Sequence, residues 1–338
     1  MAKYHSYRGR TPLRRKLAVA AMLLILLLCG SYLAVSQYIE FESGGGKTFR
    51  LPWVSETQES EKESTENTEL PDISLVINEP LDALEDEMNA VEVSAETLRL
   101  RRDEGEWWKT EGFNAVSVRL KEKDGMLRYA FASAPAELIH PGALSRAELE
   151  VLLGSDVYAV ARISCFSDSA AAYLDMAGKG LCQSSGYIWF DNSNSHWLDP
   201  GKEGAREYLV ALCAELAELG FDEVVLENAC YPTLGKLHKT APVAGDRAKT
   251  IEKFLTDVAK VLDEGSVRLS LAVNESVLLA GGNETAGLVL KDDLKDVLRV
   301  YVPAADPAAA EAALRTLSET TKLVQINGAE GARCTVRR

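Results

Sequence analysis

Two kinds of hydrophobic pattern alternate between residues 73 and 338. Short runs rich in β-branched and aromatic residues predict strands, and longer segments with apolar residues every three or four positions predict helices. We expect strands at 74–78, 114–121, 157–164, 186–190, 223–227, 267–274, 297–302 and 322–326. We expect helices at 94–111, 145–154, 168–178, 203–219, 246–264, 288–296 and 307–320.

This alternation predicts an α/β fold, namely a closed (β/α)8 TIM-type barrel. An open doubly wound sheet is the alternative, but its usual glycine-rich phosphate turn does not follow Asn78. Local signals support several boundaries. Ser145 and Glu148 match a capping box, Asp306-Pro307 matches a helix start, and Gly220 matches a helix end. The segment 114–131 reads as a hairpin that turns at Asp124-Gly125.

The N-terminal part has a different pattern. Residues 17–35 (LAVAAMLLILLLCGSYLAV) are uncharged and apolar, and basic residues dominate positions 1–16. The positive-inside rule then predicts a cytoplasmic basic tail over 1–16, one transmembrane signal-anchor helix over 17–36, and an extracytoplasmic remainder. A cleaved signal peptide is the alternative, although the apolar run is longer than the usual signal core. A lipoprotein anchored through Cys29 is a weaker alternative, because Leu28 precedes it where a small residue is expected.

Charge divides the rest of the chain. Residues 37–72 contain an acidic stretch, 55–72, with too few apolar residues to form a core, so we expect a disordered linker before a barrel over 73–338. The formal net charge of -14 argues against a nucleic-acid partner. None of the six cysteines forms a C-x-x-C pair, so neither a zinc site nor a disulfide framework is indicated. No cofactor signature occurs.

Candidate chemistry follows the expected strands, because the active site of such a barrel lies at the carboxyl ends of its strands. Carboxylates and aromatic rings dominate there, which suits a glycan and the two-carboxylate mechanism of glycoside hydrolysis. The catalytic candidates are Glu227, Asp191 and Glu275. The substrate-binding candidates are Asp168, Trp189, His196, Trp197, Asn228 and Tyr231.

Glu227 is the sharpest candidate because it ends an apolar strand, where a carboxylate is costly unless it is used or paired. A function as acid or base, with a raised pKa, is one interpretation. A structural ion pair with a cation such as Arg162 is the other. Asp191 and His196 could equally be ordinary loop residues, and the triplet at Asn274-Glu275-Ser276 also reads as a turn.

Four segments together resemble a known family. They are GFNAVSVRLKEKDG at 112–125, YAVARISCFSD at 158–168, WLDP at 197–200 and GFDEVVLENACYP at 220–232. In order and spacing they are similar to motifs of the glycoside hydrolase-like barrel family of uncharacterised bacterial envelope proteins. The resemblance implies a (β/α)8 barrel related to polysaccharide-cleaving enzymes.

This chain departs from the family motifs at several positions. Arg119 stands where the motif carries Asp, Glu227 replaces an Asp, and Cys230 replaces an Arg. Ala272 falls where the family tends to be acidic. We therefore expect a membrane-anchored barrel that binds and possibly hydrolyses an envelope or extracellular glycan. The alternative is a glycan-binding or envelope-assembly protein that keeps the barrel but has lost the active site.

Overall fold

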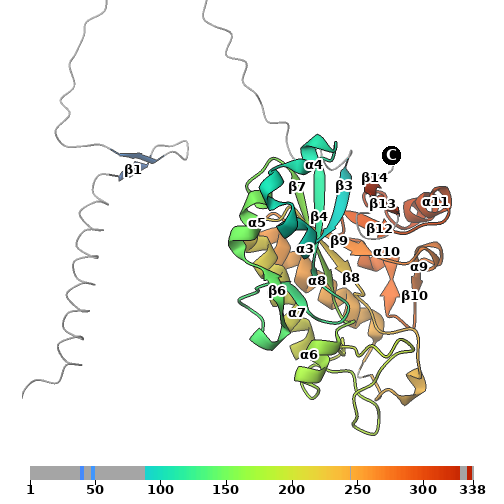
Figure 1. The fold of residues 1–338 in the computed structure, drawn as a ribbon. Coiled ribbons are helices and arrows are strands. Elements are labelled where there is room, and N and C mark those ends of the chain that lie inside the picture. The colour runs from blue at the N-terminus through green and yellow to red at the C-terminus, as the bar shows by residue number, and fades with distance from the viewer. Residues whose placement is uncertain (1–38, 42–46, 50–87, 244, 328–332, 337–338) are drawn as a thin grey trace, which may run out of the picture. The chain divides into compact units, whose positions relative to one another are not determined.

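The computed structural model describes residues 39–41, 47–49, 88–243, 245–327 and 333–336 (Figure 1). The chain divides into two compact units, residues 1–75 and 76–338. In the first unit, β1 (Ile39–Phe41) pairs antiparallel with β2 (Lys47–Phe49). The expected anchor at 17–36, the acidic stretch at 55–72 and the expected strand at 74–78 lie outside the described residues. No helix among the described residues is long and apolar enough to span a bilayer.

The second unit is an α/β fold around a ten-stranded sheet (Figure 1). Seven of its strands run parallel to one another in the order β3, β4, β7, β8, β9, β12, β13. Their bounds are β3 Asn89–Ser94, β4 Ala115–Lys121, β7 Tyr158–Ser164, β8 Glu223–Glu227, β9 Arg268–Ala272, β12 Arg299–Val302 and β13 Lys322–Asn327. The strand β14 (Arg333–Val336) pairs antiparallel with both β13 and β3. Since β3 also pairs with β4, it has a neighbour on each side.

The strand predictions are confirmed at six places and wrong at one. The expected strand at 186–190 is a loop, held by isolated bridges such as Cys182 to Ile188 and Phe190 to His196. The sequence pattern also missed β3 and β14, so the described sheet is not the uniform parallel set that was expected. The hairpin prediction is confirmed, because β4 pairs antiparallel with β5 (Leu127–Tyr129). The strand β6 (Ile139–Leu144) continues this edge, and β10 (Gly282–Asn283) pairs with β11 (Leu288–Val289).

Helices pack on the outside of the sheet because each has an apolar face. On α8 (Arg247–Glu264) the buried residues Ile251, Phe254, Leu255, Val258 and Leu262 recur at helical spacing. The other helices are α3 Ala95–Leu100, α4 Trp107–Thr110, α5 Arg146–Leu153, α6 Ser169–Leu174, α7 Glu203–Leu219, α9 Glu275–Leu279, α10 Leu290–Asp293 and α11 Pro307–Leu317. Short 3-10 turns form η1 Arg102–Glu104, η2 Ala136–Leu138 and η3 Leu237–Lys239.

The predicted helix signals are largely confirmed. Ser145 and Glu148 form the capping box, Asp306 caps α11, and Gly220 ends α7 in the left-handed conformation with φ 92°. The expected helix over 94–111 is instead broken into α3, η1 and α4. Its break coincides with Gly105, whose φ of 63° is incompatible with a continuing right-handed helix.

The side chains of each strand alternate between two cores. On β8, Val224 and Leu226 belong to the large core between sheet and helices, whereas Val225 belongs to a smaller cluster with Ala90, Ala115, Tyr158, Val160, Tyr301 and Val324. Because successive residues of a strand face opposite sides, Glu223 and Glu227 lie on the same side as Val225. The smaller cluster is therefore bordered by charged residues.

Candidate functional site

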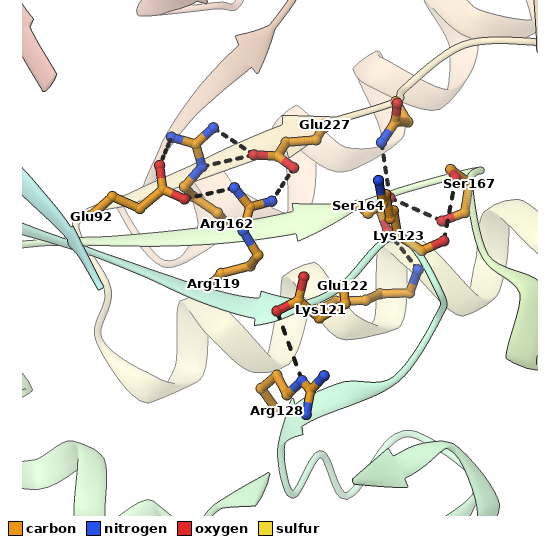
Figure 2. A network of polar contacts seen from close by, with 11 residues as sticks. Glu92, Arg119, Lys121, Glu122, Lys123, Arg128, Arg162, Ser164, Ser167 and Glu227 are labelled. Atoms are coloured by element: carbon orange, nitrogen blue, oxygen red, sulfur yellow. Dashed lines mark hydrogen bonds and ion pairs between the residues drawn. The ribbon is translucent and has the colours of Figure 1, made fainter. Parts of the chain in front are cut away.

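Two glutamates and two arginines meet at the carboxyl ends of four neighbouring strands (Figure 2). Glu92 lies on β3, Arg119 on β4, Arg162 on β7 and Glu227 on β8. Since these strands are parallel neighbours, the four side chains converge at one end of the sheet. We refer to these four residues as the Arg–Glu ring.

Each guanidinium of the Arg–Glu ring contacts both carboxylates. Arg119 donates to Glu92 at 2.6 Å and to Glu227. The Nε of Arg162 donates to Glu227 Oε1 at 2.8 Å. The Nη1 of Arg162 lies 3.0 Å from Glu92 Oε2, which is an ion-pair distance without hydrogen-bond alignment. Both carboxylates are thus shared between two cations.

The ring is partly shielded from water, so its charges interact strongly. The side chain of Arg162 is 3% exposed and that of Glu227 15% exposed. Burial favours the neutral form of Glu227, but the attraction of Arg162 and Arg119 outweighs it and lowers the pKa. The expectation of a raised pKa at Glu227 is therefore wrong. Burial opposes the charge of Arg119 too, yet Glu227 and Glu92 raise its pKa further.

A second buried ion pair lies beside the ring. The Nζ of Lys121 is 2.8 Å from Asp168 Oδ2, and both side chains are 0% exposed. Lys121 also donates to the carbonyl of Ser164 at 2.6 Å, and Asp168 Oδ1 accepts from the backbone N–H of Ala171 at the start of α6. These contacts give Asp168, a predicted substrate-binding residue, a structural role.

A cavity of about 630 Å³ opens next to the Arg–Glu ring. It lies where β3 and β4 end, between α3 and the strands β5 and β6. Its lining includes Glu92, Arg99, Arg119, Glu122, Arg128 and His140. We call it the strand-end cavity. Its position matches the end of the sheet at which parallel α/β barrels bind their ligands.

The other two predicted catalytic residues make contacts of their own. Asp191 accepts from the backbone N–H groups of Ser193 and Ser195 and, at 3.1 Å, from the indole N–H of Trp197. Glu275 begins α9 and accepts from the backbone N–H of Asp306 at 2.9 Å. Both carboxylates hold loop or helix-end backbone, whereas Glu227 contacts Arg119 and Arg162.

Three of the remaining predicted binding residues lie in the long loop between α6 and α7. Trp189 is buried and donates to the carbonyl of Lys236 at 3.1 Å. The Nδ1 of His196 is 2.9 Å from the carbonyl oxygen of Trp189, and Trp197 donates to Asp191. The hydrogen bonds of these three side chains hold the loop in place.

The last two predicted binding residues follow β8. Asn228 has a φ of 51° and donates to the hydroxyl of Ser164 at 3.0 Å. Tyr231 is buried, with Arg247 above its ring at 5.1 Å. Both residues therefore pack against protein groups in this structure.

Sequence reasoning missed Glu92 and the residues of the strand-end cavity. Glu92 interrupts the apolar run of β3 in the same way that Glu227 ends β8, so the same signal was present. It was overlooked because the first strand was expected at 74–78. Glu122, Arg128 and His140 come from a turn and two strands, β5 and β6, that only the tertiary structure brings together. Within the described part of the chain, no three His, Cys, Asp or Glu side chains are grouped to hold a metal ion.

Three solved structures are similar to this chain. The glycoside hydrolase domain of PgaB (BpsB) from Bordetella bronchiseptica aligns with a TM-score of 0.52 at 14% identity, covering 69% of this chain and 82% of that chain. A hypothetical protein from Ruminiclostridium thermocellum ATCC 27405 aligns at 0.46 and 21% identity, covering 54% and 96%. The GH20 beta-N-acetylhexosaminidase from Streptomyces coelicolor A3(2) aligns at 0.45 and 14% identity, covering 70% and 47%.

Sequence comparison is more specific than structural similarity at these identities. No curated protein matches this chain. A family described as "Putative glycosyl hydrolase domain" matches residues 90–287, more than half of the 338 residues. The matched range contains the whole Arg–Glu ring and the lining residues of the strand-end cavity named above. The chain belongs to this glycosyl hydrolase-like family.

Proposed function

We propose that this protein binds a glycan at the strand-end cavity and does not hydrolyse it through Glu227. The Arg–Glu ring supports this proposal. Both oxygens of Glu227 contact guanidinium groups, and so do both oxygens of Glu92. Glu92, which lines the cavity, and Glu227 beside it are therefore held as ionised partners of Arg119 and Arg162.

Hydrolysis of a glycosidic bond needs a carboxyl group that is protonated near neutral pH and a second carboxylate free to act as base or nucleophile. The lowered pKa of Glu227 works against the first role. The guanidinium contacts occupy the oxygens that the second role would use. Family membership and the polar lining of the cavity support glycan binding, because hydroxyl groups bond well to carboxylates, guanidinium groups and imidazole.

Hydrolysis by Glu227 with Asp191 or Glu275 as the second carboxylate is the competing function. The contacts of Asp191 and Glu275 described above favour roles in holding loops. The two functions differ in one measurable product, since hydrolysis creates new reducing ends and binding does not.

The experiment uses the purified full-length chain in detergent. It is incubated with neutral and acidic hexasaccharides, and reducing ends and binding heat are both recorded. Binding without new reducing ends supports the proposal. Cleavage that is lost in Glu227→Gln, while circular dichroism shows that the variant is still folded, would instead support the competing hydrolase. Absence of any binding would overturn glycan recognition.

We further propose that residues 17–36 anchor the protein in a membrane, with residues 1–16 in the cytoplasm and the folded domain outside. The apolar run and its basic flank support this orientation. Protease added to intact cells, with any outer wall removed, should then cut within 55–72 and release a soluble domain. Protection of that segment in intact cells would contradict the orientation.

We also propose that the strands close into a TIM-type barrel. The strand β3 pairs with β4 on one side and with β14 on the other, which suits a barrel whose last position is taken by an antiparallel strand. Deleting residues 333–338 should then expose an edge of β3 and lower the melting temperature. An unchanged melting temperature would argue against this closure.

A further inference from the structure

The ion pairs around the strand-end cavity differ in the distance between their charged atoms. Arg99 donates to Glu148 at 2.6 Å and also contacts the carbonyls of Gly142 and Ala143. Arg119 is held at 2.6 Å by Glu92 and also by Glu227. In contrast, Arg128 Nε lies 3.8 Å from Glu122 Oε1, which is too far for a hydrogen bond.

Arg128 is therefore the guanidinium of this cavity whose hydrogen-bonding capacity is least used. Its Nε is buried and has no hydrogen-bond partner in the described structure. A buried donor without an acceptor costs free energy, so the protein gains little from the present position of this guanidinium. A ligand would meet the exposed part of the guanidinium, since the Nε itself is out of reach of solvent. The side chains of Arg128 and Glu122 are 26% and 32% exposed, so a ligand can reach both.

Glu122 supplies the complementary acceptor. It follows β4 directly, in the turn to β5, and faces Arg128 (Figure 2). Burial raises its pKa, against the opposing attraction of Arg119 and Arg128. The carboxyl group is thus partly desolvated and incompletely compensated by its cations.

His140 adds a donor of fixed orientation. The backbone N–H of Gly142 donates to His140 Nδ1 at 3.0 Å, so in the neutral ring the proton is carried by Nε2. His140 lines the same cavity as Glu122 and Arg128. The cavity therefore presents one acceptor, the Glu122 carboxylate, and two donors, Arg128 and His140 Nε2. Within the described part of the chain, Glu122 and Arg128 form no hydrogen bond with each other.

The charges of the lining decide which ligand fits. The lining contains the carboxylates of Glu92, Glu96 and Glu122 and the guanidinium groups of Arg99, Arg119 and Arg128. Glu148 neutralises Arg99, and Glu92 and Glu227 neutralise Arg119. An acidic sugar would lose hydration here without meeting an unpaired cation, because Arg128 has Glu122 beside it. A sugar hydroxyl can donate to Glu122 and accept from Arg128 at the same time.

We propose that Glu122 and Arg128, together with His140, bind the hydroxyl groups of a neutral sugar residue in the strand-end cavity. This inference rests on the proposed glycan binding and names its substrate class. Glu122 and Arg128 favour a neutral sugar with many hydroxyl groups over a uronic acid. The Arg–Glu ring lies beside this subsite.

The test measures binding of cellohexaose, N-acetylchitohexaose and hexagalacturonate to the full-length chain by calorimetry. Glu122→Gln and Arg128→Gln should each weaken binding of the neutral hexamers about tenfold or more. Their melting temperatures should stay close to the parent value, because the 3.8 Å contact contributes little to folding. The double variant should lose less affinity than the two single losses multiplied, since both residues bind the same hydroxyl groups.

A matched control comes from an exposed pair on α11. Arg315 donates to Glu311 at 2.8 Å, and Arg315→Gln should leave affinity unchanged. If the parent binds a hexamer but both variants at 122 and 128 bind it equally well, the subsite is wrong while glycan binding stands. Tighter binding of hexagalacturonate than of the neutral hexamers would also overturn the subsite. A parent that binds none of the three overturns both proposals.

Discussion

Arg119 and Arg162 stand opposite each other in the register of β4 and β7. Like charges at directly paired positions of adjacent strands repel and normally destabilise a sheet. Here Glu92 and Glu227 lie on the outer neighbours β3 and β8 and contact both guanidinium groups. The four charges therefore depend on one another, and removal of one leaves a partner uncompensated.

Replacing Glu227 with Gln should lower the free energy of unfolding by about 3–5 kcal/mol, because two largely buried guanidinium groups would lose half of their counter-charge. Chemical denaturation at pH 7 measures this loss. Glu311→Gln, in an exposed pair with Arg315, should change stability by only about 0.5 kcal/mol. A similarly small effect at Glu227 would show that the ring does not stabilise the fold.

The lowered pKa of Glu227 also predicts a pH dependence. A carboxyl group whose pKa is depressed by folding stabilises the protein above its unfolded pKa of about 4.3, and this stabilisation is lost as the pH falls. The parent should therefore lose stability in acid more steeply than Glu227→Gln. Equal slopes in denaturation curves between neutral and acidic pH would contradict the assignment.

Gly125 should not tolerate a side chain. Its φ is 93°, and a Cβ there would overlap Asp168 Oδ1 and lie 2.9 Å from the backbone nitrogen of Ala170. Gly125→Ala should displace Asp168 from Lys121 and cost about 3 kcal/mol or more. Gly186 is the matched control, since its φ is 85° but a Cβ would meet nothing within 4 Å. Gly186→Ala should cost only about 1–2 kcal/mol, and equal melting temperatures for the two variants would refute this account.

Asp293 should make stability fall as the pH rises. Burial, aided by Glu252 and Asp292, raises its pKa to about 7. A carboxyl group with a raised folded pKa stabilises the protein below its unfolded pKa of about 3.9, and this contribution disappears as the pH rises through 7. Asp293→Asn keeps an acceptor for the N–H of Val289 and should be more stable than the parent at pH 8, by up to about 3 kcal/mol.

The control for Asp293 is Asp257→Asn, which removes an exposed carboxylate paired with Lys253. Its stability relative to the parent should change little between pH 5 and pH 8. If Asp293→Asn behaves like this control in urea denaturation at both pH values, the raised pKa is wrong.

The described cysteines predict insensitivity to reduction. Cys165, Cys182, Cys213 and Cys230 are free thiols, and burial raises the pKa of Cys213 and of Cys230 to about 12. Dithiothreitol should leave the melting temperature within about 1 °C of its value without reductant. A fall equivalent to the loss of a native disulfide, about 2–5 kcal/mol, would contradict this prediction.

Much of the fold could be predicted because it depends on local patterns. The alternation of short β-branched runs with amphipathic segments located β4, β7, β8, β9, β12 and β13, and α7 lies at its predicted bounds of 203–219. Local caps at Ser145, Asp306 and Gly220 also agree with the structure. The prediction of a strand at 186–190 is wrong because these residues belong to a long loop. There Trp189 packs inward and donates a hydrogen bond to the carbonyl of Lys236.

The family, the α/β class and the importance of Glu227 could all be predicted from the sequence. A carboxylate at the end of an apolar strand is costly wherever that strand lies. The contacts of Glu227, in contrast, depend on how distant strands pair. Arg119 and Glu92 lie more than a hundred positions away from it, and the parallel register of β3, β4, β7 and β8 brings them together. The sign of the pKa shift at Glu227 follows from that proximity, since two nearby guanidinium groups outweigh the effect of burial.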